Sequence, residues 1–197
     1  MDDHERLDPE IAGHDAAVSE ERRLDRTDGS VDAVLLLGPL YHLTDRGDRI
    51  RALAEARRVL RPGGILVAAI SRFASTLDGL LRAHLDEPGF EAIVEGDVRD
   101  GRHRNPAGRP EWFTTAYFHL PEELGGEVTE AGLRLEAVLA VEGPAWMLPD
   151  IERRLADPGR RERVLAAIRR VETEPSLLGA SAHLLAVAAV GAPGGPR

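Results

Sequence analysis

The stretch from Ser30 to Ser71 constrains what this chain can fold into more than any other. It holds two unbroken apolar runs, Ala33 to Leu37 and Ile65 to Ile70, on either side of a segment with helical periodicity. Unbroken runs of this length are typical of strands buried on both faces of a helix-covered parallel sheet. The helix between them has candidate caps in Thr44 and Asp45. We therefore predict a right-handed βαβ unit.

The helix of this unit is predicted to bury one face, because its apolar residues recur at helical spacing. Pro62, Gly63 and Gly64 follow it, and they are predicted to end the helix and to turn the chain into the second strand. The apolar positions are Ile50, Leu53, Ala54 and Leu60. The charged positions predicted to point elsewhere are Arg49, Arg51, Glu55 and Arg58.

Two further buried strands are predicted at Leu133–Val141 and Ala182–Val190, so the fold class is α/β with about four strong strands. The last two could form a hairpin around a helical pair, which would make one strand antiparallel. Residues 74–110 are predicted to form a helical insertion over the end of the sheet. The predicted helices after the first are Ala74–His84, Phe90–Val98, Pro121–Ala131, Asp150–Leu155 and Arg160–Val171.

A chain of 197 residues favours one domain, which we place at residues 30–190. Residues 1–29 are polar and weakly patterned, with a short strand predicted at Ala16–Ser19. Thr27 to Ser30 reads as a turn before the first strong strand. Residues 191–197 form a Pro/Gly tail that is expected to be disordered.

The composition excludes several classes of function. A net charge of −9 argues against binding to nucleic acid or to an anionic membrane. The absence of cysteine excludes disulfides and thiolate metal sites, and the histidines show no spacing that favours any other metal site. No apolar run approaches the ~20 residues of a membrane span, and the acidic N-terminus does not resemble a signal peptide. We expect a soluble cytoplasmic protein.

Four segments in order resemble a known family: VDAVLLLGPLYHL, EARRVLRPGGILVAAIS, FTTAYFHLPEEL and SAHLLAVAAV. Over residues 16–190 the chain resembles the class I S-adenosylmethionine-dependent methyltransferases, closest to the small-molecule enzymes of the ubiquinone-biosynthesis type. The resemblance implies a doubly wound, Rossmann-like sheet of seven strands with S-adenosylmethionine as cofactor. The four predicted strands would be the fourth to the seventh, and the last would be antiparallel.

The chain departs from the family in its first part. No D-x-G-x-G loop and no following acidic residue for the ribose precede Ser30, where two further βαβ units would be expected. The chain therefore resembles a truncated carboxyl-terminal part of the fold, and weak or absent cofactor binding is expected from it alone. The strand Ala33–Leu37 would lie near an open edge. We expect a second chain, as in a homodimer, or the N-terminal 29 residues to cover it.

Ligands of open α/β sheets bind at the carboxyl ends of the strands. The resemblance places Gly38, Pro39 and Leu40 against the cofactor, and Tyr41 and His42 at the site of methyl transfer. His42 could act as a general base, since the pKa of histidine lies near neutrality. The alternative is that Tyr41 and His42 only pack against or cap the next helix.

Candidate substrate contacts follow the second strand and occupy the aromatic segment. Arg72 could hold an anionic group, or pair with a nearby acid at the surface. Trp112, Tyr117 and His119 could line an acceptor pocket. The alternative is core packing, which we favour for Phe113 and Phe118.

Three classes of function follow. The first is methyl transfer from S-adenosylmethionine to a small-molecule acceptor. The second is a non-catalytic methyltransferase remnant or interaction protein that lacks the cofactor-binding half. The third, a nicotinamide-dependent oxidoreductase, is disfavoured because G-x-G-x-x-G is absent.

Overall fold

The computed structural model describes residues 24–191 of the chain. The predicted strand at Ala16–Ser19 and residues 192–197 of the predicted tail lie outside this range. None of the helices within it is long and apolar enough to cross a membrane.

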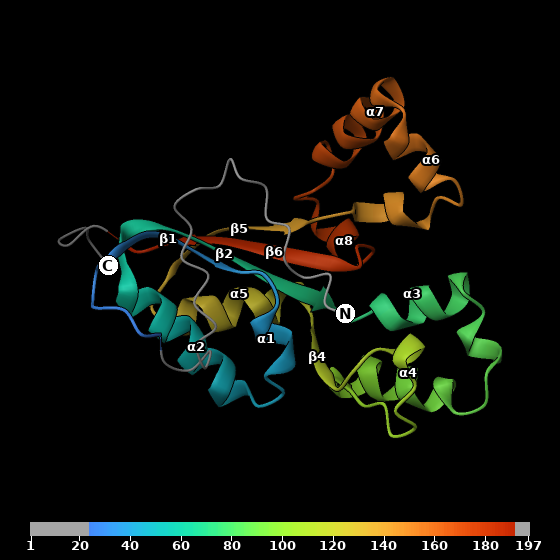
Figure 1. Ribbon diagram of the computed structural model, residues 1–197, viewed down its shortest axis with the longest axis horizontal. Helices are drawn as coiled ribbons and strands as arrows, with labels where there is room; N and C mark the ends of the chain where they lie inside the picture. Colours follow the sequence, from blue (N-terminus) through green and yellow to red (C-terminus); the bar gives the residue numbers. More distant parts are fainter. Residues whose placement is uncertain (1–23, 192–197) are drawn as a thin grey trace, which may run out of the picture.

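The described residues form one sheet with helices around it (Figure 1). Its six strands are β1 (Val31–Leu36), β2 (Leu60–Ser71), β3 (Arg102–His103), β4 (Ala116–His119), β5 (Arg134–Ala140) and β6 (His183–Ala189). The α-helices are α1 (Pro39–His42), α2 (Arg46–Val59), α3 (Ala74–Leu81), α4 (Phe90–Asp100), α5 (Pro121–Glu130), α6 (Ile151–Ala156), α7 (Pro158–Arg169) and α8 (Pro175–Leu178). Short 3-10 turns are η2 (His84–Asp86), η3 (Pro110–Trp112) and η4 (Gly143–Met147).

The long strand β2 is the centre of the sheet. It pairs in parallel with β1 on one side and antiparallel with β6 on the other, and β5 pairs antiparallel with β6. The parallel β1–β2 pair, joined through α2, confirms the predicted βαβ connection, and the antiparallel last strand is confirmed as well. β4 pairs in parallel with the last two residues of β2, and β3 pairs antiparallel with β4.

The start of α2 is confirmed and its predicted end is wrong. The side chain of Asp45 accepts a hydrogen bond from the Asp48 backbone N–H, so Asp45 is the cap. The helix ends at Val59, and β2 begins at once with Leu60. Pro62, Gly63 and Gly64 therefore lie inside a strand and make no turn. They do so because the β1–β2 ladder is irregular there, and a bulge tolerates proline.

Gly63 is required by a close backbone contact at this bulge. A Cβ on Gly63 would lie 2.3 Å from the carbonyl oxygen of Asp32, whereas a Cβ on Gly64 would lie 3.7 Å from the nearest atom, the Ala188 carbonyl oxygen. We expect Gly63→Ala to lower the free energy of unfolding by about 1–3 kcal/mol through overpacking. The neighbouring Gly64→Ala is expected to change it by less than about 1 kcal/mol. Urea unfolding of both variants checks this; equal effects would contradict the bulge geometry.

Helices α2 and α5 lie side by side on one face of the sheet (Figure 1). Between them and the sheet lies the main core, in which Leu53, Ile65, Val67, Leu124 and Leu184 are almost completely buried. The buried face of α2 differs from the predicted one, because Ala54 is exposed and Arg49 is buried. The residues that α2 buries are Arg49, Ala52, Leu53, Ala56 and Val59.

β1 is buried on one face only, so the predicted burial on both faces is wrong for this strand. Leu36 is 8% exposed, whereas Leu35 and Leu37 are 55% and 56% exposed. Among the described strands β1 pairs only with β2, so it is an edge strand, as the truncated resemblance implied. An exposed apolar edge of this kind is a site where another strand or chain can pair.

Candidate active site

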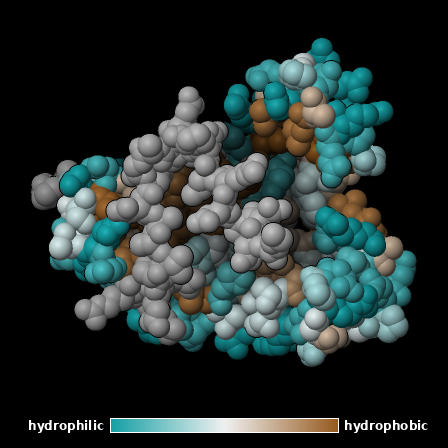
Figure 2. Space-filling model, in the orientation of Figure 1, coloured by the Kyte–Doolittle hydropathy of each residue, from teal (hydrophilic) through white to brown (hydrophobic). Residues whose placement is uncertain are grey.

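A cavity of about 420 Å³ lies at the carboxyl end of β2. It opens between the segment that holds α3 and α4 and the segment that holds η4, and hydrophobic residues border this hollow in Figure 2. The size suits a small organic ligand. Its lining residues are Ile70, Ala74, Ser75, Asp78, Arg82, Phe90, His103, Glu111, Trp112, Phe113, Phe118, Glu142, Trp146, Ala182 and His183.

Aromatic rings form the wall of the cavity on the side of α4 and β4. Phe90 and Trp112 pack with ring centroids 5.5 Å apart, and the His103 ring stacks on Phe118 at 4.8 Å. Trp112 is 5% exposed and Phe118 is 3% exposed, whereas Phe113 is 41% exposed. Core packing is therefore observed for Phe118, while the prediction of a core position for Phe113 is wrong.

A buried polar cluster supports this wall. Oδ2 of Asp97 accepts from the Ser75 hydroxyl at 2.6 Å and lies 2.8 Å from Nδ1 of His103. Nε2 of His103 lies 2.6 Å from the carbonyl oxygen of Trp112, so this nitrogen must donate. The cluster ties α3, α4, β3 and η3 together, and both ring nitrogens of His103 are engaged.

The opposite end of the cavity is polar. Glu142 follows β5 and His183 begins β6, and Oε1 of Glu142 lies 2.6 Å from Nδ1 of His183. Oε2 of Glu142 accepts from the Ser181 hydroxyl at 2.8 Å and from the backbone N–H of His183 at 3.0 Å. The hydrogen bond to Glu142 raises the pKa of His183 above its usual 6.5.

The loop after β1 lies next to the aromatic wall. The Phe113 ring is 6.2 Å from that of Tyr41 and 6.3 Å from that of His42, and Tyr41 packs on the apolar cluster that contains Ile70 and Phe118. Leu40 is completely buried in the main core. Of the predicted cofactor-facing residues, Gly38 and Pro39 are half-buried, whereas the Leu40 side chain faces inward.

These residues fit one wall of an S-adenosylmethionine site and not a complete site. β1 is the outermost described strand on this side, so no described strand stands opposite Gly38. Gly38 is extended (φ 173°), and a Cβ there would contact only the Tyr41 hydroxyl, at 3.6 Å.

The predicted substrate contacts separate into two places. Trp112 lines the cavity, whereas Arg72, Tyr117 and His119 lie in a second polar network on the other side of β4. Arg72 is 4% exposed, donates to the Phe118 carbonyl oxygen at 2.8 Å and pairs with Glu123 at 2.5 Å. The partner of Arg72 is therefore an acid of the protein itself. Pairing with an acid was the alternative to binding an anionic substrate, but the pair is buried and not at the surface.

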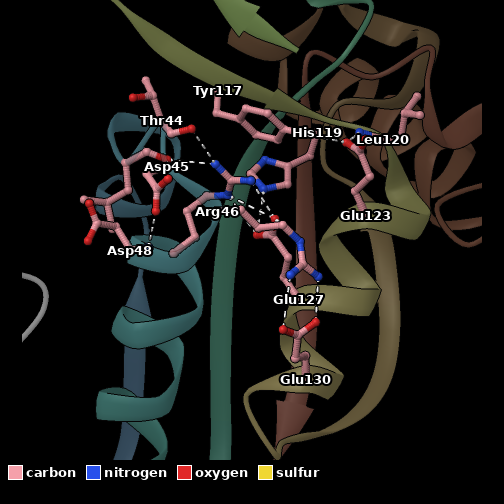
Figure 3. A network of polar contacts seen from close by, with 12 residues as sticks. Thr44, Asp45, Arg46, Asp48, Tyr117, His119, Leu120, Glu123, Glu127 and Glu130 are labelled. Atoms are coloured by element: carbon pink, nitrogen blue, oxygen red, sulfur yellow. Dashed lines mark hydrogen bonds and ion pairs between the residues drawn. The ribbon is translucent and has the colours of Figure 1, made fainter. Parts of the chain in front are cut away.

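Arg49 and Glu127 are the centre of this second network (Figure 3). Arg49 is 1% exposed and donates to both carboxylate oxygens of Glu127, at 2.9 and 2.6 Å. Its third nitrogen donates to the carbonyl oxygens of Leu43 and Thr44, and its guanidinium lies 3.7 Å from the centre of the Tyr117 ring. All three nitrogens of this buried cation are therefore engaged, and α2 is joined to α5 and β4.

His119 completes the network with a depressed pKa. Its Nε2 lies 3.3 Å from Oε2 of Glu127, and its Nδ1 is buried with no hydrogen-bond partner among the described residues. Burial lowers the pKa of His119 below 6.5, against the opposing hydrogen bond to Glu127. Burial raises the pKa of Glu127, but hydrogen bonds from His119 and Arg49 outweigh it and hold the pKa at about 2.

Both shifts make the fold sensitive to acid. A group with a depressed folded pKa stabilises the fold above its unfolded pKa, and this stability is lost as the pH falls through the folded pKa. We expect the free energy of unfolding to fall below about pH 6.5 as unfolded His119 binds protons, and again below about pH 4.5 because of Glu127. Urea titrations between pH 8 and 4 check this. His119→Leu should flatten the first decrease; an unchanged slope would contradict the assignment.

Sequence reasoning missed the Glu142–His183 pair and the Asp97–His103 pair. A signal for the first pair was present, because an antiparallel last strand brings its amino end, His183, to the carboxyl ends of β2 and β5. The second pair joins α4 to a two-residue strand, which is too short to show a periodic pattern. Within the described residues no group of three or more metal-ligating side chains occurs.

Comparison with known proteins identifies the fold. The methyltransferase domain family matches residues 5–68, a range that includes β1, α2 and most of β2. The solved structure of an S-adenosylmethionine-dependent methyltransferase from Methanosarcina mazei superposes with a TM-score of 0.50 at 14% identity, covering 87% of this chain and 64% of that one. One from Mesorhizobium loti gives 0.51 at 11% identity, covering 87% and 67%.

The described residues therefore have the fold of S-adenosylmethionine-dependent methyltransferases, and residues 5–68 match the methyltransferase domain family. Their strand order is β1-β2-β6-β5, and the antiparallel β6 agrees with the expectation for the seventh strand of that fold. The chain spans less than two thirds of the length of the Methanosarcina protein.

Proposed function

We propose that this chain takes part in methyl transfer from S-adenosylmethionine to a small-molecule acceptor. The observation that carries the proposal is the aromatic cavity at the carboxyl end of β2, beside the loop Gly38–His42. Ligands of open α/β sheets bind at this end. The bound cofactor would supply the methyl group. The residues of the chain would hold the acceptor and exclude water from it, with Tyr41 and His42 between the two sites.

The described residues form only one wall of the cofactor site, so we expect a partner to supply the other wall. Leu35 and Leu37 are more than half exposed on the open edge of β1, where the fold would continue. We propose that a second copy of the chain or another chain covers strand 33–37. Light scattering after size-exclusion chromatography tests the homodimer: a stable monomer at all concentrations would contradict it and would leave another chain as the partner. The net charge of −9 argues against nucleic-acid or anionic-membrane partners.

The test of the function is calorimetric titration of the full chain with S-adenosylhomocysteine. We expect weak binding that disappears when Gly38 is replaced by a bulky residue, as in Gly38→Trp, and that persists in Gly126→Ala, where a Cβ meets nothing within 4 Å. No binding at millimolar ligand would contradict the proposal. It would favour the second candidate function, a non-catalytic remnant that acts through the open edge of β1. The observation that supports this candidate is that the described residues form only one wall of the cofactor site.

A further inference from the structure

Two histidines line the cavity, and only one has a ring nitrogen available to a ligand. His103 is 1% exposed and uses both nitrogens, one toward Asp97 and one toward the Trp112 carbonyl oxygen. His183 has a side chain that is 47% exposed, and only its Nδ1 is engaged, by Glu142. No hydrogen bond of its Nε2 is found within residues 24–191, so this nitrogen can meet a molecule in the cavity.

The fold holds the His183 ring in place from behind. Glu142 is fixed by the hydroxyl of the fully buried Ser181 and by the backbone N–H of His183. The Ser181 oxygen in turn accepts from the backbone N–H groups of Glu142 and Gly143, at 3.1 Å each. A carboxylate that orients a histidine through Nδ1 leaves Nε2 as the proton acceptor, the arrangement that general bases use.

We propose that the cavity binds a small planar aromatic molecule through its hydroxyl group, and that Nε2 of His183 accepts the hydroxyl proton. This rests on the proposed function in naming that molecule as the methyl acceptor. The O–H bond breaks, the oxygen keeps the electron pair, and the proton forms an N–H bond on His183. The resulting imidazolium is balanced by Glu142 and the phenolate. His183 thus takes the role of base that the sequence predicted for His42.

The lining determines this choice of ligand. Phe90, Trp112, Phe113 and Trp146 offer flat apolar surfaces, which suit an aromatic ring. Asp78, Glu111 and Glu142 also line the cavity with one arginine, Arg82, which pairs with Asp78 at 2.7 Å. The excess of acids disfavours an acceptor that carries a carboxylate or a phosphate. A volume of about 420 Å³ limits the molecule to one or two rings. The raised pKa of His183 makes it a stronger base than an ordinary histidine.

4-Nitrophenol is the probe that tests the proposal, because its anion absorbs visible light and its neutral form does not. Both tryptophans of the chain, Trp112 and Trp146, line the cavity, so tryptophan quenching reports binding. We expect the full chain to quench on titration and the bound probe to become anionic. His183→Gln should weaken binding at least tenfold and abolish the increase in anion absorbance that binding causes, and Glu142→Gln should reduce both.

The matched controls are Glu136→Gln, on the exposed side of β5, and Glu95→Gln, an exposed acid of α4; both lie outside the cavity lining. Both should bind as the unchanged chain does. Ala74→Leu should block binding with the His183 pair intact, which keeps the test valid if His183→Gln misfolds.

Binding without the anion, no binding, or tighter binding of benzylamine would each overturn the proposal. The nitrophenol measurement needs no cofactor. If the chain does not bind S-adenosylhomocysteine, the proposed function is contradicted, but the binding of nitrophenol at His183 is still tested.

Discussion

Replacing Arg49 by methionine is expected to lower the free energy of unfolding by about 3–5 kcal/mol. The substitution leaves Glu127, whose side chain is 2% exposed, as a buried charge without its bidentate partner. It also leaves the Leu43 carbonyl oxygen without its Arg49 donor and removes the contact with the Tyr117 ring. Urea unfolding monitored by circular dichroism measures the change.

Two further variants separate a buried ion pair from simple loss of charge. Arg51→Met removes an arginine whose side chain is 64% exposed on the same helix, and it should change stability much less. The double variant Arg49→Met with Glu127→Leu should recover most of the lost stability, because two apolar side chains replace the pair. If the double variant is as unstable as the single one, the loss does not come from the unpaired carboxylate.

Asp97→Leu is expected to lower the free energy of unfolding by about 3 kcal/mol, because it leaves two buried polar side chains without their shared partner. Asp97 is completely buried, and it accepts from Ser75 and contacts His103. The cluster supports the aromatic wall, so the variant should also lose binding of 4-nitrophenol. Differential scanning calorimetry and tryptophan quenching measure the two effects.

The control for Asp97 lies on the same helix. Glu95 is an exposed acid of α4, and Glu95→Leu should leave both the melting temperature and probe binding close to those of the unchanged chain. Equal losses in the two variants would show that α4 is sensitive to any apolar substitution, and the role of the buried cluster would then be wrong.

The strands were predictable where apolar runs were long. The predicted Leu133–Val141 and Ala182–Val190 differ from β5 and β6 by one residue at each end. β4 was missed because four residues in an aromatic segment carry too little pattern to distinguish a strand. Its pairing with the end of β2 is a tertiary contact that the local sequence does not specify.

Arg49 shows why the buried polar network escaped prediction. Arginine is seldom buried, so the sequence placed Arg49 on the polar face of α2. Its partner Glu127 is 78 residues further along, on α5, and only packing of the two helices makes burial of both favourable. The Glu142–His183 pair spans 41 residues in the same way, and it depends on β5 and β6 being neighbours.

A crystal structure of the full chain with S-adenosylhomocysteine and 4-nitrophenol tests the account most directly. We predict that S-adenosylhomocysteine lies against Gly38 and Pro39 at the end of β1. The nitrophenol ring should lie among the cavity aromatics, with its oxygen in hydrogen-bond contact with Nε2 of His183. Nitrophenol bound outside the cavity, or S-adenosylhomocysteine bound away from the carboxyl ends of β1 and β2, would contradict the account.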